Sequence, residues 1–359
     1  MTQPGRNEGI AARAPVEIGI IGAGWWACQA YIPRLLNHPD VSGVAVMRRD
    51  ERALAKIAET FGTDLLFTDA AQMLEQRRLG GVIVASPHHL HAEHALMCIR
   101  KGLPVMIEKP MAVSSADARS IIDAADRQGV PVIVPYGWNF KPMTDTAYRL
   151  IREGWVGEIR HVSVHMASAL KDLFAGKPPE RTKDHLFRPP ASTWSDHERA
   201  GGYGWGQLTH ALGVLFRLVD LDPASVFARA GTSPTGVDYY DAAVVQMENG
   251  ATMTLSGAAT LPNPRRFQLD IRIFGEDGVL LYDIERARVE ALRHDGRSRI
   301  EPLSPDAGEY ETDGALGRFV DLCMGRNVEN PASPVIGYRA TRLIDAMYRS
   351  LASGRMEPA

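Results

Sequence analysis

A lysine at position 109 is the residue of this chain best suited to chemistry. It follows the short apolar run PVMIE (104–108) and precedes Pro110. Proline disfavours a helical conformation in the residue before it, so Lys109 is expected to stay extended at the end of a strand. An ammonium group at the carboxyl edge of a sheet can stabilise an alkoxide that develops while hydride leaves the same carbon. The sequence therefore predicts Lys109 as a catalytic cation.

A glycine motif provides the second candidate site. Gly22 and Gly24, with Ala27 three residues later, follow the apolar run VEIGII (16–21) and precede an amphipathic segment. Glycine permits a tight turn and close approach of the backbone to a pyrophosphate, and the helix that follows offers free N–H groups. The pattern predicts a dinucleotide site, with Trp25 and Trp26 inside the turn.

The end of the second predicted strand bears on the choice of dinucleotide. The sequence there is VAVMRRD, which places Arg48 where an acidic residue would bind the ribose hydroxyls of NAD. Two guanidinium groups, those of Arg48 and Arg49, favour the 2′-phosphate of NADP. In the alternative reading both arginines are solvated and Asp50 reaches the ribose. We expect NAD(P) as cofactor, with NADP favoured over NAD.

The elements that must position these residues follow an alternating pattern. Between residues 16 and 137, short β-branched runs alternate with segments of helical apolar periodicity. The expected strands are VEIGII, GVAVM, LLF, GVIVAS, PVMIE and PVIVPY. This order predicts an α/β fold with an N-terminal doubly wound (Rossmann) parallel sheet, which binds ligands beyond the carboxyl ends of its strands.

The remainder of the chain has a different pattern of apolar residues. Longer alternating segments joined by turn signals such as ENG and EDG predict an α+β domain with a large, mostly antiparallel open sheet. The expected organisation is a flexible tail over 1–15, a dinucleotide-binding domain over 16–137 and a substrate-binding and oligomerisation domain over 138–359. The charged, Pro-rich segment 171–201 is expected to form a loop over a cleft. The positively charged side chains of this segment either lie solvated at the rim of the cleft or bind an anionic substituent of the substrate.

Composition excludes several classes of function. The 359 residues are 45% hydrophobic and carry a net charge of −3, with no basic cluster for nucleic acid and no apolar run for a membrane. The three widely spaced cysteines predict neither a disulfide framework nor a metal site. We expect a cytoplasmic protein with a small-molecule substrate that forms a homo-oligomer, a dimer or tetramer, through the open sheet.

One longer stretch carries a family resemblance. The segment ASPHHLHAEHALMCIRKGLPVMIEKPMA (85–112), together with the glycine turn, resembles the Gfo/Idh/MocA family. The resemblance implies an NAD(P)-dependent oxidoreductase acting on sugars, cyclitols and their derivatives. It implies that Glu108 and Lys109 belong to an E-K-P motif, with Lys109 touching the substrate hydroxyl and the nicotinamide ribose. The resemblance further implies a cofactor-side turn made of Ser86, Pro87, His88 and His91, with His88 where asparagine is usual, and a cleft segment with Asn139 and Lys141.

The resemblance also implies a second catalytic element, within AGGYGWGQLTHALGVLF (200–216). His210 fits the histidine of the family's D-x-x-x-H pattern, but Gly206 stands at the aspartate position. Gln207 and His210 are three residues apart and share one helix face. With an ordinary pKa near ~6.5, His210 is expected to exchange the hydroxyl proton, and Gln207 to hydrogen-bond the substrate. The aromatic residues expected to stack on a sugar are Trp138, Tyr203 and Trp205.

Three functions are consistent with these residues. The first is a dehydrogenase that transfers hydride between a secondary carbinol and the nicotinamide. The second is a redox-assisted glycosidase that recycles a tightly bound cofactor, because THALG (209–213) resembles a segment of such family members, although Gln207 stands where those enzymes have tyrosine. The third is a non-catalytic sensor, a class that tends to lose the lysine present here at position 109.

Overall fold

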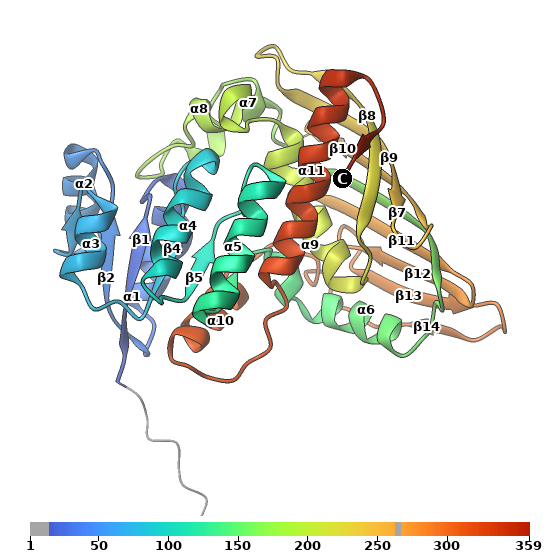
Figure 1. The fold of residues 1–359 in the computed structure, drawn as a ribbon, viewed down its shortest axis with the longest axis horizontal. Helices are drawn as coiled ribbons and strands as arrows, with labels where there is room; N and C mark the ends of the chain where they lie inside the picture. The colour runs from blue at the N-terminus through green and yellow to red at the C-terminus, as the bar shows by residue number, and fades with distance from the viewer. Residues whose placement is uncertain (1–13, 263–266) are drawn as a thin grey trace, which may run out of the picture.

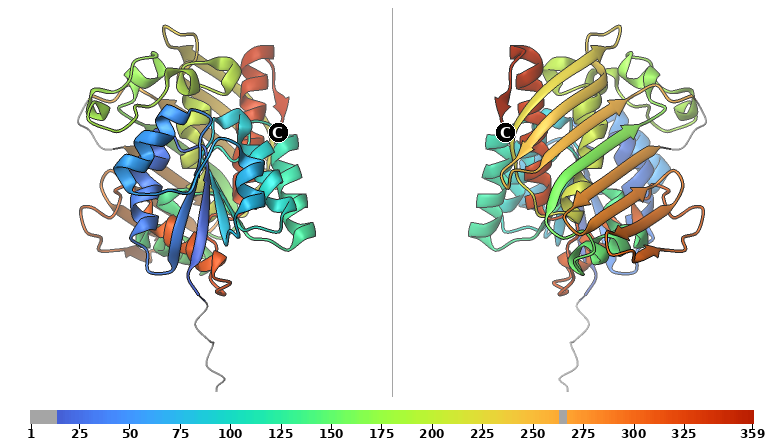
Figure 2. Two further views of the ribbon diagram at one scale, coloured as in Figure 1. Left: turned by 90° about the vertical axis from the view of Figure 1, so that its left-hand side faces the viewer. Right: turned by 90° about the vertical axis from the view of Figure 1, so that its right-hand side faces the viewer.

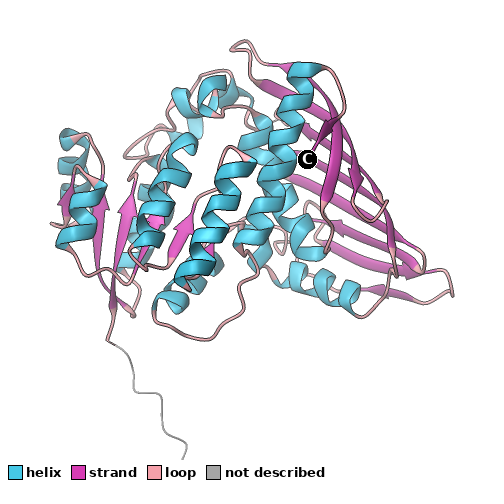
Figure 3. Cartoon of the chain, viewed as in Figure 1, coloured by secondary structure: helices cyan, strands magenta, loops and turns pink. Residues whose placement is uncertain are grey.

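Two β-sheets form the framework of the protein. The computed structural model describes residues 14–262 and 267–359, so the expected tail falls outside the described residues up to position 13. A six-stranded sheet and a nine-stranded sheet lie at opposite sides of a central layer of helices (Figures 1 and 3). The expected fold class, a Rossmann sheet followed by an α+β region with an open sheet, is confirmed.

The first sheet is wholly parallel, in the order β3-β2-β1-β4-β5-β6. The strand order reverses between β1 and β4, which makes the crevice above these two strands the expected ligand site of such a sheet. The strands are β1 (Val16–Ile21), β2 (Val41–Met47), β3 (Leu66–Phe67), β4 (Gly81–Val84), β5 (Val105–Ile107) and β6 (Val132–Ile133).

The helices of the parallel sheet begin and end at residues suited to those positions. Asp50 accepts hydrogen bonds from two backbone N–H groups at the start of α2, and Ser114 caps α5 in the same way. Gly62 and Gly129 end these two helices in the left-handed conformation. The helices are η1 (Ala27–Tyr31), α1 (Ile32–Leu36), α2 (Glu51–Phe61), α3 (Ala70–Gln76), α4 (His91–Arg100) and α5 (Ser115–Gln128).

The second sheet has the order β14-β13-β12-β11-β7-β10-β9-β8-β15, and its pairs are antiparallel except β7 with β10. Its strands are β7 (Ile159–Ala167), β8 (Pro223–Thr232), β9 (Asp238–Met247), β10 (Thr252–Ala258), β11 (Gln268–Gly275), β12 (Gly278–Asp283), β13 (Arg288–Arg293), β14 (Ser298–Ile300) and β15 (Glu357–Pro358). Helices cover one face and leave the other open (Figure 2, right).

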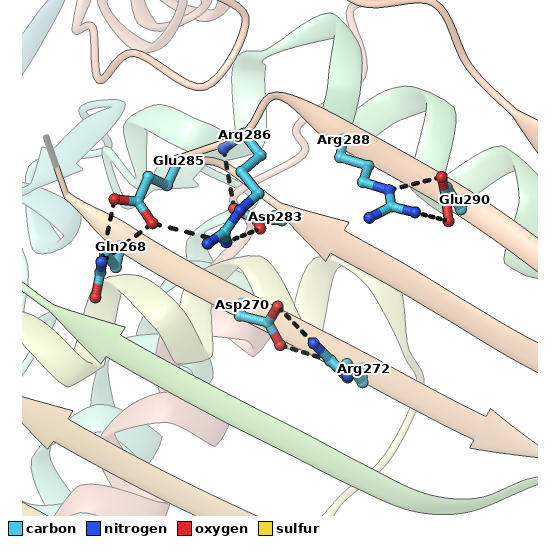
Figure 4. A network of polar contacts seen from close by, with 8 residues as sticks. All are labelled: Gln268, Asp270, Arg272, Asp283, Glu285, Arg286, Arg288 and Glu290. Carbon is cyan, nitrogen blue, oxygen red and sulfur yellow. Dashed lines mark hydrogen bonds and ion pairs between the residues drawn. The ribbon is translucent and has the colours of Figure 1, made fainter.

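The open face carries both polar and apolar side chains. Ion pairs run over β11, β12 and β13, including Arg272 with Asp270 and Arg288 with Glu290 (Figure 4). Glu290 is buried, whereas a partly exposed pair such as Arg272 with Asp270 contributes only about 0–1 kcal/mol. Oligomerisation through this face stays a prediction.

Long helices join the two sheets into one body. The C-terminal helix α11 (Pro334–Ser353) packs against α5, against α9 (Thr209–Leu218) and against β8. The other helices of the C-terminal half are η3 (Gly137–Phe140), α6 (Pro142–Arg152), α7 (Lys171–Phe174), η4 (Glu180–Thr182), α8 (Ala191–Trp194), η5 (His197–Arg199), η6 (Gly204–Leu208) and α10 (Asp313–Cys323). The segment 171–201, expected as a loop, therefore contains short helices. None of the described helices is long and apolar enough to cross a bilayer.

Gly213 shows how closely α9 packs on the end of the parallel sheet. A Cβ atom at this position would lie 2.4 Å from the ring of Tyr136, whereas a Cβ at Gly317 in α10 would meet nothing within 4 Å. We expect Gly213→Ala to lower the free energy of unfolding by about 1–3 kcal/mol through overpacking. Gly317→Ala, the matched helical control, is expected to raise it by about 0.5–1 kcal/mol. Denaturant unfolding measures both, and equal effects of the two variants would contradict this packing.

Candidate active site

A cavity of about 650 Å3 lies beyond the carboxyl ends of the parallel strands. One side is lined by residues that follow β1, β2, β4 and β5; the other is lined by η6, α9 and the segment that carries α7 and α8 (Figure 1). Among the described residues the lining includes these expected site residues: Gly22, Gly24, Trp25, Trp26, Arg48, Arg49, Ser86, Pro87, His88, His91, Glu108, Lys109, Trp138, Gln207 and His210.

The glycine turn forms the floor of one end of the cavity. Gly22 has φ +92°, and a Cβ there would lie 2.4 Å from the backbone nitrogen of Ser86, so the turn itself requires glycine. A Cβ at Gly24 would meet only the Gly22 carbonyl oxygen, at 3.9 Å. The space over Gly24 is therefore open to a ligand, which fits the close approach of a pyrophosphate. Ala27 is buried behind the turn and does not line the cavity.

The two arginines after β2 occupy different environments. Arg48 donates to the Ala23 carbonyl (2.8 Å), and its guanidinium lies 4.2 Å from the ring centroid of Phe187. Arg49 is exposed and lines the cavity. One carboxylate oxygen of Asp50 accepts from the N–H groups at the start of α2, at 3.0 and 3.2 Å. Asp50 also lines the cavity, so its capping role leaves open the alternative in which it holds the ribose.

Histidines hold the turn after β4. The ring nitrogens of His91 lie 2.7 Å from the carbonyl oxygens of Ser86 and Pro110, so this side chain ties the turn to the end of β5. His88 Nδ1 lies 3.0 Å from the Ala200 carbonyl oxygen. Burial lowers the pKa of His88 to about 3. A neutral His88 therefore donates to the segment that precedes η6 and links it to the cofactor side of the cavity.

Lys109 connects the two halves of the cavity. Its ammonium donates to the Gly206 carbonyl in η6 (3.0 Å) and lies 5.3 Å from the ring centroid of Trp194. Burial lowers the pKa of Lys109 to about 8, and the neighbouring Glu108 opposes this shift. The charge of Lys109 therefore changes closer to neutral pH than that of an ordinary lysine.

Glu108 is supported by a chain of buried groups. The Tyr31 hydroxyl donates to a Glu108 carboxylate oxygen, and Trp26 Nε1 donates to the Tyr31 hydroxyl at 3.3 Å. Burial raises the pKa of Glu108, whereas Lys109 and the Tyr31 hydrogen bond lower it. Tyr31, which no sequence motif indicates, therefore holds the Glu108 carboxylate in position next to Lys109.

Gln207 and His210 both line the cavity. Gln207 Oε1 and His210 Nδ1 are buried and have no hydrogen-bond partner among the described residues. Aromatic rings surround His210, with the centroids of Trp138 and Tyr310 at 5.7 and 5.3 Å. Burial lowers the pKa of His210 well below its usual range, and the charge of Lys109 adds to this effect. Burial therefore favours the neutral form of His210 over the ordinary pKa near 6.5 assumed from the sequence.

Two predicted sugar-stacking residues do not reach the cavity. Tyr203 is fully buried and donates to the Met166 carbonyl (3.2 Å). Trp205 stacks on Tyr348 with centroids 5.5 Å apart and an angle of 6°. Residues Gly204–Leu208 form a π-helix, so the side chains preceding His210 do not follow the α-helical spacing that the prediction assumed.

Asn139 and Lys141 are also absent from the lining of the cavity. Asn139 is fully buried, and its Nδ2 donates to the carbonyls of Gly213 and Pro331 at 3.0 Å each. It therefore connects η3 with α9 instead of facing a ligand. Lys141 is the residue before α6, which leads away from the cavity towards β13.

The structure adds lining residues that the sequence did not reveal: His94, Leu170, Leu173, Thr193, Trp194, Phe267 and Tyr310. Trp194 has a particular place among them. A Cβ at Gly206 would lie 3.1 Å from the Trp194 ring and 3.0 Å from the Phe174 ring. Aromatic rings thus fill the space at the position where the family resemblance places an aspartate. In the sequence, this contact is indicated only by the presence of a tryptophan within the segment 171–201, which is expected to form a loop.

Comparisons with known proteins agree with this geometry. A family model described as "Oxidoreductase family, NAD-binding Rossmann fold" (GFO_IDH_MocA) matches residues 16–136, and the GFO/IDH/MocA C-terminal domain model matches residues 144–281. Among solved structures, the WlbA dehydrogenase from Bordetella pertussis, in complex with NADH and UDP-GlcNAcA, has a TM-score of 0.73 at 21% identity. That match covers 96% of this chain and 99% of the other, and it shows the shared fold.

Two curated relatives are informative. The dTDP-3,4-didehydro-2,6-dideoxy-alpha-D-glucose 3-reductase of Streptomyces antibioticus is 25% identical over 312 residues, 81% of this chain and 84% of the relative. The D-glucoside 3-dehydrogenase of Escherichia coli is 30% identical over 146 residues, which cover 41% of this chain and 42% of the relative.

The two glycines of the turn separate ligand binding from folding. We expect Gly24→Val to weaken NAD(P)H binding by about tenfold or more, because the added methyl groups would enter the open space above the turn. Its melting temperature is expected to stay near that of the wild type. Gly22→Ala is the matched comparison and is expected to lower the melting temperature, since it strains a positive φ. Fluorescence titration and thermal unfolding measure both; undiminished NAD(P)H binding by Gly24→Val would contradict the assigned site.

Proposed function

Because this chain belongs to the Gfo/Idh/MocA family of oxidoreductases, we propose that it transfers hydride between the nicotinamide of NAD(P) and a secondary hydroxyl or ketone of a sugar, cyclitol or sugar derivative. One observation carries the proposal: Lys109, Gln207 and His210 line one cavity, and that cavity continues to the glycine turn. The sugar names of the curated relatives support the substrate class.

The residues of the chain divide the work between binding and proton transfer. When bound, the nicotinamide supplies the site that accepts or donates hydride. Lys109 has three N–H donors, of which one is used on Gly206, so the others can hold the reacting oxygen. With a pKa of about 8, Lys109 takes the hydroxyl proton in oxidation and returns it in reduction.

His210 has a different role in this proposal. As a neutral ring it exchanges no net proton, and it hydrogen-bonds the substrate through a ring nitrogen. The Gln207 amide hydrogen-bonds a second hydroxyl of the substrate. In this proposal Lys109 exchanges the substrate proton, a role that the sequence predicts for His210. Redox-neutral glycoside cleavage gains no specific support from the structure.

We also infer that NADP is preferred over NAD. The exposed Arg49 lines the cavity beside Arg48, while Asp50 caps α2. A 2′-phosphate would receive charge-assisted hydrogen bonds from Arg49, which the ribose hydroxyl of NAD cannot match.

The role of Lys109 predicts a loss of turnover and a change in pH dependence. Lys109→Ala is expected to lower kcat/KM by about a hundredfold or more, because it removes the proton acceptor and the cation at the reacting oxygen. NAD(P)H affinity should change little. In the wild type, the kcat/KM for carbinol oxidation should rise with pH through about 8 and then level, because the neutral amine is the reactive form.

Two variants test the assignment further. Lys109→Arg keeps the charge but does not lose its proton, so the step near pH 8 should vanish. Lys101→Ala, an exposed lysine beyond α4, is the control and should keep wild-type rates. Unchanged turnover by Lys109→Ala would show that Lys109 has no role in the reaction.

The cofactor preference is tested at Arg49. Arg49→Ala is expected to weaken NADPH binding roughly 10- to 100-fold, the loss of about 1.5–3 kcal/mol of charge-assisted bonding, and to leave NADH binding nearly unchanged. Arg52→Ala, which removes an exposed arginine within α2 outside the cavity lining, is the control. Equal losses for NADPH and NADH, or tighter wild-type binding of NADH, would overturn the NADP preference.

A further inference from the structure

We propose that the substrate is a glycoside with an aryl or alkyl aglycone, and that Trp194 selects it. The proposal rests on the function proposed above and names its substrate class. It concerns one side of the cavity, formed by Leu170, Leu173 and Trp194 and called the apolar wall below.

The apolar wall stands where the family resemblance places a carboxylate. Gly206 has no side chain, and the Trp194 and Phe174 rings occupy the space that a Cβ there would enter, at 3.1 and 3.0 Å. A carboxylate at this position would accept hydrogen bonds from sugar hydroxyls. An indole ring and two leucines accept no hydrogen bond, and only the indole N–H can donate one, so a hydroxyl set against them would lose most of its hydrogen bonds to water. The group that faces the wall is therefore apolar.

Trp194 is held firmly in place. Its ring packs edge-on against His88, with centroids 5.3 Å apart, and edge-on against Phe174, at 6.1 Å. His88 is itself fixed by its hydrogen bond to the Ala200 carbonyl. A preorganised aromatic surface binds an apolar group at little cost in side-chain entropy.

The polar groups near the reacting centre are few. Lys109, Gln207 and His210 lie together beside η6, and the rings of Trp138 and Tyr310 enclose His210. Three polar side chains are enough to hydrogen-bond the reacting hydroxyl and one neighbouring hydroxyl of the substrate. Among the described residues, this end of the cavity offers a sugar ring one polar edge and an apolar wall, which suits a glycoside whose aglycone is apolar.

Two basic residues of the segment 171–201, Arg181 and His185, also line the cavity. His185 Nδ1 accepts from Trp25 Nε1 (2.8 Å), which places it at the glycine turn and not beside Gly206. Arg181 is exposed. An anionic sugar held by Arg181 is the competing substrate class, and a uronic acid serves as its probe.

The test compares kcat/KM for matched compounds with the full-length protein and NADP+ or NAD+. For glucose, galactose, mannose and xylose, the free sugar is measured beside its methyl and phenyl glycosides in both anomers, and glucuronic acid is included. At least one phenyl glycoside is expected to exceed its free sugar by about 10- to 100-fold. Trp194→Ala should reduce that ratio to about threefold or less, and Trp194→Phe should retain most of it.

The ratio is the readout because Trp194 also contacts Lys109, so the alanine variant is expected to slow every substrate. Trp155→Ala, a tryptophan outside the cavity lining, is the control and should keep the wild-type ratio. A free sugar or glucuronic acid that equals the best phenyl glycoside, or a ratio that survives in Trp194→Ala, overturns the proposal.

Calorimetric titration in the presence of NADPH separates the two hypotheses. If no compound is oxidised but a phenyl glycoside binds at least about tenfold more tightly than its free sugar, and Trp194→Ala abolishes this difference, the proposed hydride transfer fails and the aglycone preference stands. If free sugars are oxidised as well as glycosides, the preference fails and hydride transfer stands. If no phenyl glycoside binds, the preference is overturned.

Discussion

The hydrogen bond from the Lys109 ammonium to the Gly206 carbonyl joins the two halves of the site. Lys109 follows the fifth strand of the parallel sheet, whereas Gly206 lies in the π-helix that leads into α9. The geometry of the cavity therefore depends on where η6 is anchored. Asp238 provides that anchor, because its carboxylate accepts from the Gly204 N–H and from the Tyr348 hydroxyl, each at 2.7 Å. A buried carboxylate bound in this way fixes the start of η6 and, through it, the position of the lysine.

Short-range sequence patterns predict one half of the site. The Rossmann topology, the glycine turn and the lysine after β5 depend on short-range patterns: a strand, a positive φ, and a proline after the lysine. Such patterns act within a few residues, so they can be read without knowing the rest of the fold. All of these residues meet in the cavity, although their roles stay proposals.

The other half depends on tertiary contacts that no local pattern reveals. The sequence predicts that Tyr203 and Trp205 stack on a sugar. In the structure, at the π-helix η6, Tyr203 contacts Met166 and Trp205 contacts Tyr348. The pKa of His210 depends on the aromatic rings and the ammonium that fold around it. The segment 171–201 is expected over a cleft and lines the cavity, but the contact of Trp194 with Gly206 depends on the tertiary fold of the segment, which sequence periodicity cannot predict.

The glycine at position 206 links the shape of the cavity to its acid–base chemistry. An aspartate there would place a carboxylate beside Lys109 and raise the pKa of the lysine, because an opposite charge favours the ammonium form. With glycine at 206 and Trp194 against it, only Glu108 opposes the effect of burial, and the pKa of Lys109 falls to about 8. His210 likewise has no carboxylate partner and stays neutral. The absence of one carboxylate thus leaves an apolar wall and, at the same time, a lysine with a pKa that suits the proton exchange proposed for it.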